Sequence, residues 1–145
     1  MKYFHSINMR LFVYSHENKA ELIKKIVDLQ EALGFKIKLE ESQALGFLDK
    51  KITILTFNIK KDKQTKDLAN FLLSKVSSDL NYEKRIDDSC NFYLRLDKLS
   101  FLDDEYLLTE KGDCVHFTFN IAAYPKNKDV AIKVFKEFLE QNHYK

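Results

Sequence analysis

Glycine is scarce in this chain of 145 residues, which contains only Gly34, Gly46 and Gly112. The loops that wrap nucleotide phosphates in the common nucleotide-binding folds need several glycines at short, fixed spacings. The three glycines here are widely separated. The sequence therefore excludes both glycine-rich nucleotide-binding fingerprints.

Long apolar runs are also missing. No stretch approaches the roughly 20 apolar residues that cross a bilayer, and the opening Met-Lys-Tyr-Phe-His-Ser lacks the continuous apolar segment of a signal peptide. Apolar residues make up 45% and charged residues 32% of the chain, which is the balance of a globular protein. We expect a single domain over residues 1–145, located in the cytoplasm and with no membrane partner.

Cysteine is limited to Cys90 and Cys114, each of which precedes a predicted strand. If these strands pair as an antiparallel hairpin, the two residues lie about 20 Å apart, whereas a disulfide needs a Cα separation below about 7 Å. We therefore predict two free thiols.

Cys114 and His116 are too few ligands for a zinc site, and Cys90 lies too far from His116 for a nucleophile–base pair. The sequence predicts no metal, no cofactor and no catalytic residue.

Two stretches in the second half of the chain alternate apolar and polar residues, which is typical of strands with one buried face. The apolar rows are Phe92, Leu94 and Leu96 in the first stretch, and Val115, Phe117, Phe119 and Ile121 in the second. The connection over residues 98–113 is long for a hairpin loop and partly apolar, so we expect a helical turn or a short strand within it.

The first predicted strand, over residues 3–14, has apolar side chains in both of its rows, so we expect it in the middle of the sheet. One row contains His5, Ile7, Met9, Leu11 and Val13, and the other contains Phe4, Ser6, Asn8, Arg10, Phe12 and Tyr14.

The remaining predicted elements follow from helical spacing, capping residues and β-prone runs. They are a helix from Ser15 or Asn18 to about Leu33, a short strand at 35–39 that 44–48 extends or rejoins, a turn at 49–51, a strand at 52–59, a helix from Asp62 or Thr65 to about Leu80, and a helix at about 128–141 capped by Asn127. The order is β-α-β-β-α-β-β-α. Hairpins alternating with helices predict an α+β fold, with a single largely antiparallel sheet and helices packed on one face.

The charges are unevenly distributed, although the net charge is only +2. Six lysines and two aspartates lie between Asp49 and Lys66, and six acids and two lysines lie between Asp97 and Asp113. We expect a basic end and an acidic end of the molecule. A lysine-rich solvated surface without a ligand is the alternative.

Arginine accounts for only three of the 24 basic residues, Arg10, Arg85 and Arg95. All three lie in or beside predicted strands. The planar fork of arginine suits phosphate or carboxylate better than the point charge of lysine. Each arginine could therefore contact a phosphate or form a structural ion pair with a nearby aspartate.

One row of the predicted sheet points away from the core. It contains Asn8, Arg10, Tyr93, Arg95, His116, Thr118 and Asn120. Aromatic rings can stack on bases, while cations and amides hold phosphates and base edges, so this face suits single-stranded or irregular RNA. Packing against a second subunit would use such a face equally well.

Two long patterns resemble a known family. They are Arg-Ile-Asp-x3-Asn-x-Tyr-Leu-Arg-Leu-Asp-Lys, from Arg85 to Lys98, and Val-His-x5-Ala-x-Tyr-Pro, from Val115 to Pro125. Together they resemble a family of small archaeal RNA-binding domain proteins that is labelled exosome-subunit-like. The resemblance implies RNA binding and a fold similar to the large-subunit ribosomal protein that binds the five-S RNA. The matching residues are Arg85, Asp87, Asn91, Tyr93, Arg95, Asp97, Lys98, His116, Tyr124 and Pro125.

These observations favour a non-enzymatic RNA-binding protein that holds structured or looped RNA through a sheet face and adjacent basic loops. The predicted RNA-binding residues are Arg10, Lys50, Lys51, Lys60, Lys61, Arg85, Tyr93, Arg95, Lys98, His116, Tyr124 and Lys126. The alternative is a protein-interaction module, either a homodimer or a subunit of a larger RNA-processing or ribosome-related assembly.

Overall fold

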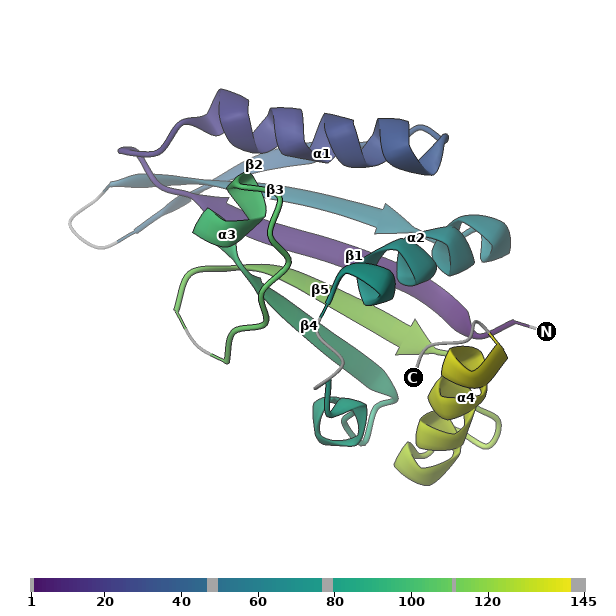
Figure 1. Cartoon of the computed structure of the whole chain (residues 1–145). Helices are drawn as coiled ribbons and strands as arrows, with labels where there is room; N and C mark the ends of the chain where they lie inside the picture. The colour runs from purple at the N-terminus through teal and green to yellow at the C-terminus, as the bar shows by residue number, and fades with distance from the viewer. Residues whose placement is uncertain (1, 47–49, 77–79, 111, 142–145) are drawn as a thin grey trace.

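A computed structural model describes residues 2–46, 50–76, 80–110 and 112–141. Five antiparallel strands form one sheet in the order β2-β3-β1-β5-β4, as Figure 1 shows. The elements are β1 Phe4–Val13, α1 Lys19–Leu33, β2 Glu40–Leu45, β3 Lys51–Ile59, α2 Asp62–Lys75, the 3-10 helix η2 Tyr82–Arg85, β4 Asn91–Asp97, α3 Lys98–Leu102, β5 Cys114–Ile121 and α4 Lys128–Gln141. The predicted α+β class and antiparallel sheet are confirmed.

The first strand lies in the middle of the sheet, as predicted, and pairs with β3 on one side and β5 on the other. The prediction of which side chains of this strand face the core is wrong at residues 4 and 5. Phe4 is fully buried and His5 is only partly buried, and the register against β5 shifts between Phe4 and Ser6. Such a bulge adds one residue to a strand and reverses which side chains face the core.

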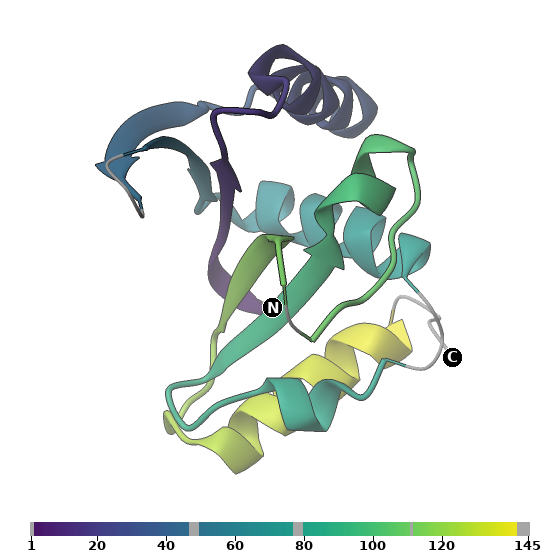
Figure 2. The ribbon, with the colours of Figure 1, turned by 90° about the vertical axis from the view of Figure 1, so that its left-hand side faces the viewer.

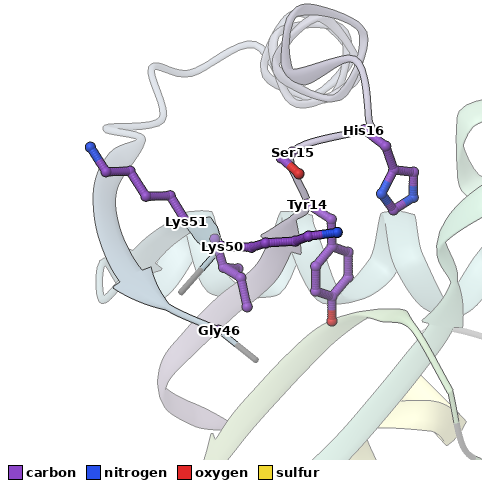
Figure 3. Close-up of a pocket in the computed structure, with 7 residues that line it drawn as sticks. Tyr14, Ser15, His16, Gly46, Lys50 and Lys51 are labelled. Carbon is purple, nitrogen blue, oxygen red and sulfur yellow. The ribbon is translucent and has the colours of Figure 1, made fainter. Parts of the chain in front are cut away.

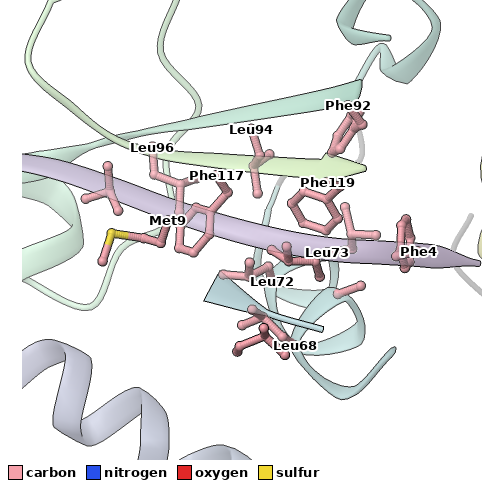
Figure 4. Packing of buried hydrophobic residues seen from close by; sticks show 14 of the residues in the cluster. Phe4, Met9, Leu68, Leu72, Leu73, Phe92, Leu94, Leu96, Phe117 and Phe119 are labelled. Atoms are coloured by element: carbon pink, nitrogen blue, oxygen red, sulfur yellow. The ribbon is translucent and has the colours of Figure 1, made fainter. Parts of the chain in front are cut away.

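The helices gather on one side of the twisted sheet, and the other side is left open (Figure 2). Between the sheet and the helices lies a phenylalanine-rich core, part of which Figure 4 shows between the strands and Leu68, Leu72 and Leu73 of α2. Phe92 contacts both Phe119 and Phe135, with ring centroids 5.2 Å and 4.4 Å away. Burying each of these rings contributes about 1.5–3 kcal/mol.

Local capping fixes the ends of the helices where the sequence predicts. The Asn18 side chain accepts a hydrogen bond from the backbone N–H of Glu21 at the start of α1. Gly34 ends the same helix with a left-handed φ of 79° and donates its N–H to the Gln30 carbonyl. Asn127 caps α4 by accepting from the N–H of Val130.

The predicted strand at 35–39 is wrong, since β2 begins only at Glu40. The backbone N–H of Ile37 donates to the Gln30 side chain at 2.8 Å, and the Ile37 side chain is buried, so this segment is tied to α1 and not to a strand. The second helix ends at Lys75, five residues earlier than predicted. Residues 47–49, which include the end of the predicted segment 44–48 and the first residue of the predicted turn, lie outside the described residues.

The 98–113 connection contains the predicted helical turn, α3, which begins after Asp97. The Asp97 carboxylate caps it by accepting from the N–H and hydroxyl of Ser100. Further along, Leu108 forms an isolated bridge with Leu96. The connection is therefore packed along the edge of β4.

Cys90 and Cys114 are both free thiols, as predicted. Cys114 lies opposite Asp97, at the last residue of β4, whereas Cys90 directly precedes that strand. Within the described ranges, no helix is long and apolar enough to cross a membrane.

Candidate functional site

The open face of the sheet carries a basic row that crosses three strands. Arg10 of β1 is paired with His116 of β5, and His116 is paired with Arg95 of β4. Neighbouring strands lie about 4.8 Å apart, so the three Cα atoms span about 10 Å. Among the described residues, no carboxylate forms an ion pair with Arg10 or Arg95.

Neutral polar rows lie next to the basic row. Asn8 of β1 is paired with Thr118 of β5, which is paired with Tyr93 of β4. One step further, Asn120 donates its side-chain amide to the Asn91 side-chain oxygen at 2.9 Å. The open face is thus basic towards one end of the sheet and rich in amides and hydroxyls towards the other.

A hollow of about 480 Å³ lies over the basic row. Its lining includes Arg10, Tyr14, Arg95, Cys114 and His116. The Nε2 atom of His116 is buried and has no hydrogen-bond partner among the described residues. Burial lowers the pKa of His116, and the charges of Arg95 and Arg10 lower it further. The imidazole is therefore held neutral between two cations.

Tyr93 is fixed in place. Its ring stacks on His116, with centroids 5.6 Å apart and an interplanar angle of 13°, and Arg95 lies 5.8 Å from the ring centroid. Its hydroxyl donates to Asp87 at 2.6 Å, and this hydrogen bond, together with burial and the Asp87 charge, raises the pKa of Tyr93. The ring is therefore held by its neighbours and does not stand free to stack on a base.

Asp87 anchors the turn before β4 by accepting from the backbone N–H groups of Ser89 and Asn91, each at 2.9 Å. Burial alone would raise the pKa of the Asp87 carboxyl. The hydrogen bonds from Tyr93, Asn91 and Ser89 outweigh burial and lower the pKa. The carboxylate is thus built into the turn.

A second, smaller hollow of about 130 Å³ shares Arg95 with the first. Its lining also includes Lys84, Arg85 and Tyr93. Arg85 forms an ion pair with Glu110 at 2.6 Å, a partner that the sequence did not predict, and its Nε atom is buried without a hydrogen-bond partner among the described residues. Access to Arg85 therefore depends on Glu110.

Lys98 does not belong to this surface. It is 1% exposed, and its ammonium group donates to the Phe12 carbonyl at 2.7 Å, to Glu17 at 2.7 Å and to Asp113 at 2.5 Å. A phosphate could reach it only after these contacts break. Lys98 is thus a structural residue, and the prediction that it contacts RNA finds no support in its position.

The predicted lysine cluster is divided between the two ends of β3. Lys50 and Lys51 lie at its start, where they line a third hollow of about 290 Å³ with Tyr14 and His16. Figure 3 shows the Lys50 side chain extending toward Tyr14 and His16, and the Lys51 side chain pointing away from them. Lys60 and Lys61 follow the end of β3, about 30 Å away. The two pairs cannot act as one patch.

Tyr124 and Lys126 follow β5 at the same end of the sheet as Lys60, since Ile7 pairs with both Ile59 and Phe119. Tyr124 is 74% exposed, and its hydroxyl lies 3.2 Å from His5 Nε2. Tyr124 therefore provides an exposed aromatic ring, whereas the ring of Tyr93 is held by its neighbours.

Half of the six acids in the predicted acidic end are ion-paired within the part of the chain that the structure describes. Asp104 pairs with Lys25, Glu110 with Arg85 and Asp113 with Lys98. Asp104 and Glu110 therefore hold the 98–113 connection against basic residues from other parts of the chain, and Asp113 pairs with Lys98 at its beginning.

Sequence reasoning missed four residues that line the hollows: Tyr14, His16, Lys84 and Glu110. Tyr14 and His16 immediately follow β1, and their rings stack with centroids 6.1 Å apart. Aromatic residues directly after a strand whose row contains an arginine are the signal that could have indicated them. Glu110 gives no such signal, because its pairing with Arg85 is tertiary.

These features define the chain as an α+β protein with helices on one face of an antiparallel sheet and a hollowed, basic surface on the other. A family model described as RNA binding matches residues 6–121, and the chain belongs to this family. A relative named RNA-binding protein PAB1135, from Pyrococcus abyssi (strain GE5 / Orsay), is 24% identical over 144 residues, with 94% of each chain covered.

Solved structures show the same fold. Mth689, a DUF54 protein from Methanothermobacter thermautotrophicus, superposes with a TM-score of 0.78 at 24% identity, covering 94% of this chain and 98% of that chain. Protein AF2318 from Archaeglobus fulgidus superposes with a TM-score of 0.79 at 21% identity, covering 93% and 99%.

Proposed function

We propose that this protein is a non-enzymatic RNA-binding protein that holds structured or looped RNA on the open face of its sheet. Its family and the name of its Pyrococcus abyssi relative support RNA as the class of ligand. The observation that carries the proposal is the row Arg10–His116–Arg95, in which two guanidinium groups lie over a hollow without a carboxylate partner among the described residues. Arginine forks of this kind suit phosphate oxygens.

The RNA would be bound chiefly through its backbone. Tyr93 is held by Asp87 and His116, so a base cannot stack on it without disrupting these contacts. The amides and hydroxyls of the neighbouring rows can instead reach phosphates and ribose hydroxyls, which are the groups that a folded RNA helix displays. This arrangement favours structured RNA over an extended single strand.

The other end of the sheet would provide a second contact. Lys60, Lys61 and Lys126 are exposed at this end, where the exposed ring of Tyr124 also lies. The lysines suit phosphates, and the ring suits an unstacked base from a loop or bulge. An RNA long enough to contact both ends of β3 would span about 30 Å.

A protein-interaction module is the second candidate. Strand β2 lies at the edge of the sheet, all of its residues are exposed, and Leu45 at its end is 70% exposed. Such an edge can pair with another chain. A homodimer, a role in an exosome-like RNA-processing or ribosome-related assembly, the likeness to the ribosomal protein, and a cytoplasmic location all stay predictions.

Fluorescence anisotropy with a labelled RNA hairpin tests the proposal. Arg10→Ala/Arg95→Ala should weaken binding at least tenfold, because hydrogen bonds to charged groups contribute about 1.5–3 kcal/mol each. The matched control is Lys63→Ala/Lys66→Ala, which removes the same charge from α2, where both lysines are already ion-paired. Circular dichroism should show that both variants are folded.

Salt separates the two candidates. RNA affinity should fall steeply as the salt concentration rises, because phosphate contacts release counterions, whereas association through backbone pairing at the β2 edge should depend less on salt. Failure of the folded wild type to bind the hairpin at low salt would contradict the proposal.

A further inference from the structure

We propose that Arg10, His116 and Arg95 form one phosphodiester-binding subsite, and that His116 takes up a proton when a phosphate of the RNA occupies it. The inference rests on the proposed function and deepens it, because it names the atoms that bind one phosphate and the pH dependence that follows.

The geometry places three donor side chains around one hollow. Arg10 and Arg95 flank His116 on either side, since β5 lies between β1 and β4. The two guanidinium charges repel each other across β5, and no carboxylate among the described residues pairs with either arginine. An anion in the hollow would relieve this repulsion.

The surroundings of His116 explain why the empty subsite favours the neutral imidazole. Arg10 and Tyr14 line the same hollow from β1 and the residue after it, Arg95 and Tyr93 face the ring from β4, and Cys114 lies two residues before it on β5. The nearest acid in the lining, Asp113, is bound to Lys98. The remaining charges at the ring are therefore positive, in agreement with the lowered pKa of His116.

A bound phosphate would place a negative charge beside His116. Its two free oxygens can accept from the forks of Arg10 and Arg95, and its negative charge offsets theirs. His116 then gains a proton from solvent, and Nε2, which is buried without a hydrogen-bond partner among the described residues, can donate to a phosphate oxygen that enters the hollow. No covalent bond forms or breaks, and one proton is taken up for each phosphate bound.

The coupling has a defined direction. The pKa of His116 lies below about 6.5 in the free protein and should rise in the complex. Between these two pKa values, the association constant for RNA should increase up to tenfold for each unit by which the pH falls. Above the pKa of the complex, affinity should not change with pH through this residue. A phosphodiester does not titrate in this range, so the proton is assigned to the protein.

The test follows the His116 imidazole by NMR from pH 5.5 to 8.0, with and without the hairpin RNA, and measures RNA affinity over the same range. We expect the pKa of His116 to rise on binding, and His116→Gln to flatten the pH dependence. Lys63→Ala/Lys66→Ala, the control on α2, should keep the pH dependence of the wild type.

Each outcome has a separate meaning. RNA binding without any rise in the pKa of His116, or an unchanged pH dependence in His116→Gln, would overturn the subsite and leave the proposed function intact. Absence of RNA binding at every pH would overturn the proposed function itself. The measurement on the wild type keeps the inference testable even if the His116 variant does not fold.

Discussion

Replacing Lys98 with methionine should destabilise the protein without removing an RNA contact. Lys98 is 1% exposed, and its ammonium group pairs with Glu17, whose side chain is 14% exposed, and with Asp113, whose side chain is 39% exposed. Breaking a buried ion pair by removing one partner costs about 3–5 kcal/mol, because the other charge is left buried. Lys98→Met should lower the free energy of unfolding by this amount, which is a large part of the 5–15 kcal/mol of an ordinary protein.

A second variant isolates the buried charge. Lys98→Met/Glu17→Gln removes both buried charges, and the remaining Asp113 can reach water, so the loss should shrink to about 1–2 kcal/mol. Lys63→Met is the control, because Lys63 has a side chain 88% exposed in its pair with Asp67. It should change stability by no more than about 0.5 kcal/mol. Urea unfolding at pH 7 measures all three.

The pH dependence gives an independent check. Burial alone would raise the pKa of the Glu17 carboxyl, but hydrogen bonds from Lys98 and the Tyr14 backbone, and the charges of Lys98 and His16, lower it overall. This stabilisation is present above the ordinary glutamate pKa of about 4.3 and is lost as the pH falls through the lowered pKa. Without Lys98 the pKa of Glu17 is lowered less, so the difference in the free energy of unfolding between the variant and the wild type should narrow in acid.

A loss below about 1 kcal/mol for Lys98→Met, or no recovery in the double variant, would refute the reasoning. RNA affinity is the functional control. Because Lys98 is buried, the folded variant should bind the hairpin as tightly as the wild type does.

Three further predictions concern the turns and the basic ends. Tyr93→Phe should lower the free energy of unfolding by about 1–3 kcal/mol in urea titrations at pH 7, since it leaves Asp87 without its phenol donor; the loss should shrink as the pH falls through the lowered pKa of Asp87. Gly34→Ala should cost about 1 kcal/mol in thermal unfolding because of its φ of +79°, although a Cβ there would meet no atom within 4 Å. Lys50→Gln/Lys51→Gln should weaken hairpin binding uniformly across RNA sequences and reduce the slope of log K against log salt by about one or two in anisotropy titrations.

Local patterns were enough to predict most of the fold. Alternation along residues 92–97 and 115–121 indicated the two faces of β4 and β5, and Asn18 and Gly34 marked the ends of α1. The predicted strand at 35–39 failed because the Gln30 side chain bonds the Ile37 N–H. Periodicity cannot show such a bond, and it cannot show the bulge near Phe4 either.

The candidate site was only partly predictable for the same reason. Alternation placed Arg10, Arg95 and His116 on the open face, but their arrangement in one row depends on the register of three strands. From the sequence alone, Lys98 is interpreted as an exposed loop lysine, because it follows Asp97 at the end of β4. Its burial depends on Glu17, which lies 81 residues earlier in the chain.

The position of β1 between β3 and β5 also determines how the protein must fold. The pairing of Ile7 with Phe119 joins residues that are more than one hundred positions apart. During synthesis β1 can pair with β3 early, while its other edge has no partner until residues 114–121 leave the ribosome. An unpaired edge is a template for association with other chains, and such distant pairing slows folding. We expect refolding in milliseconds to seconds in stopped-flow experiments, and the newly made chain is most exposed to aggregation just before β5 is complete.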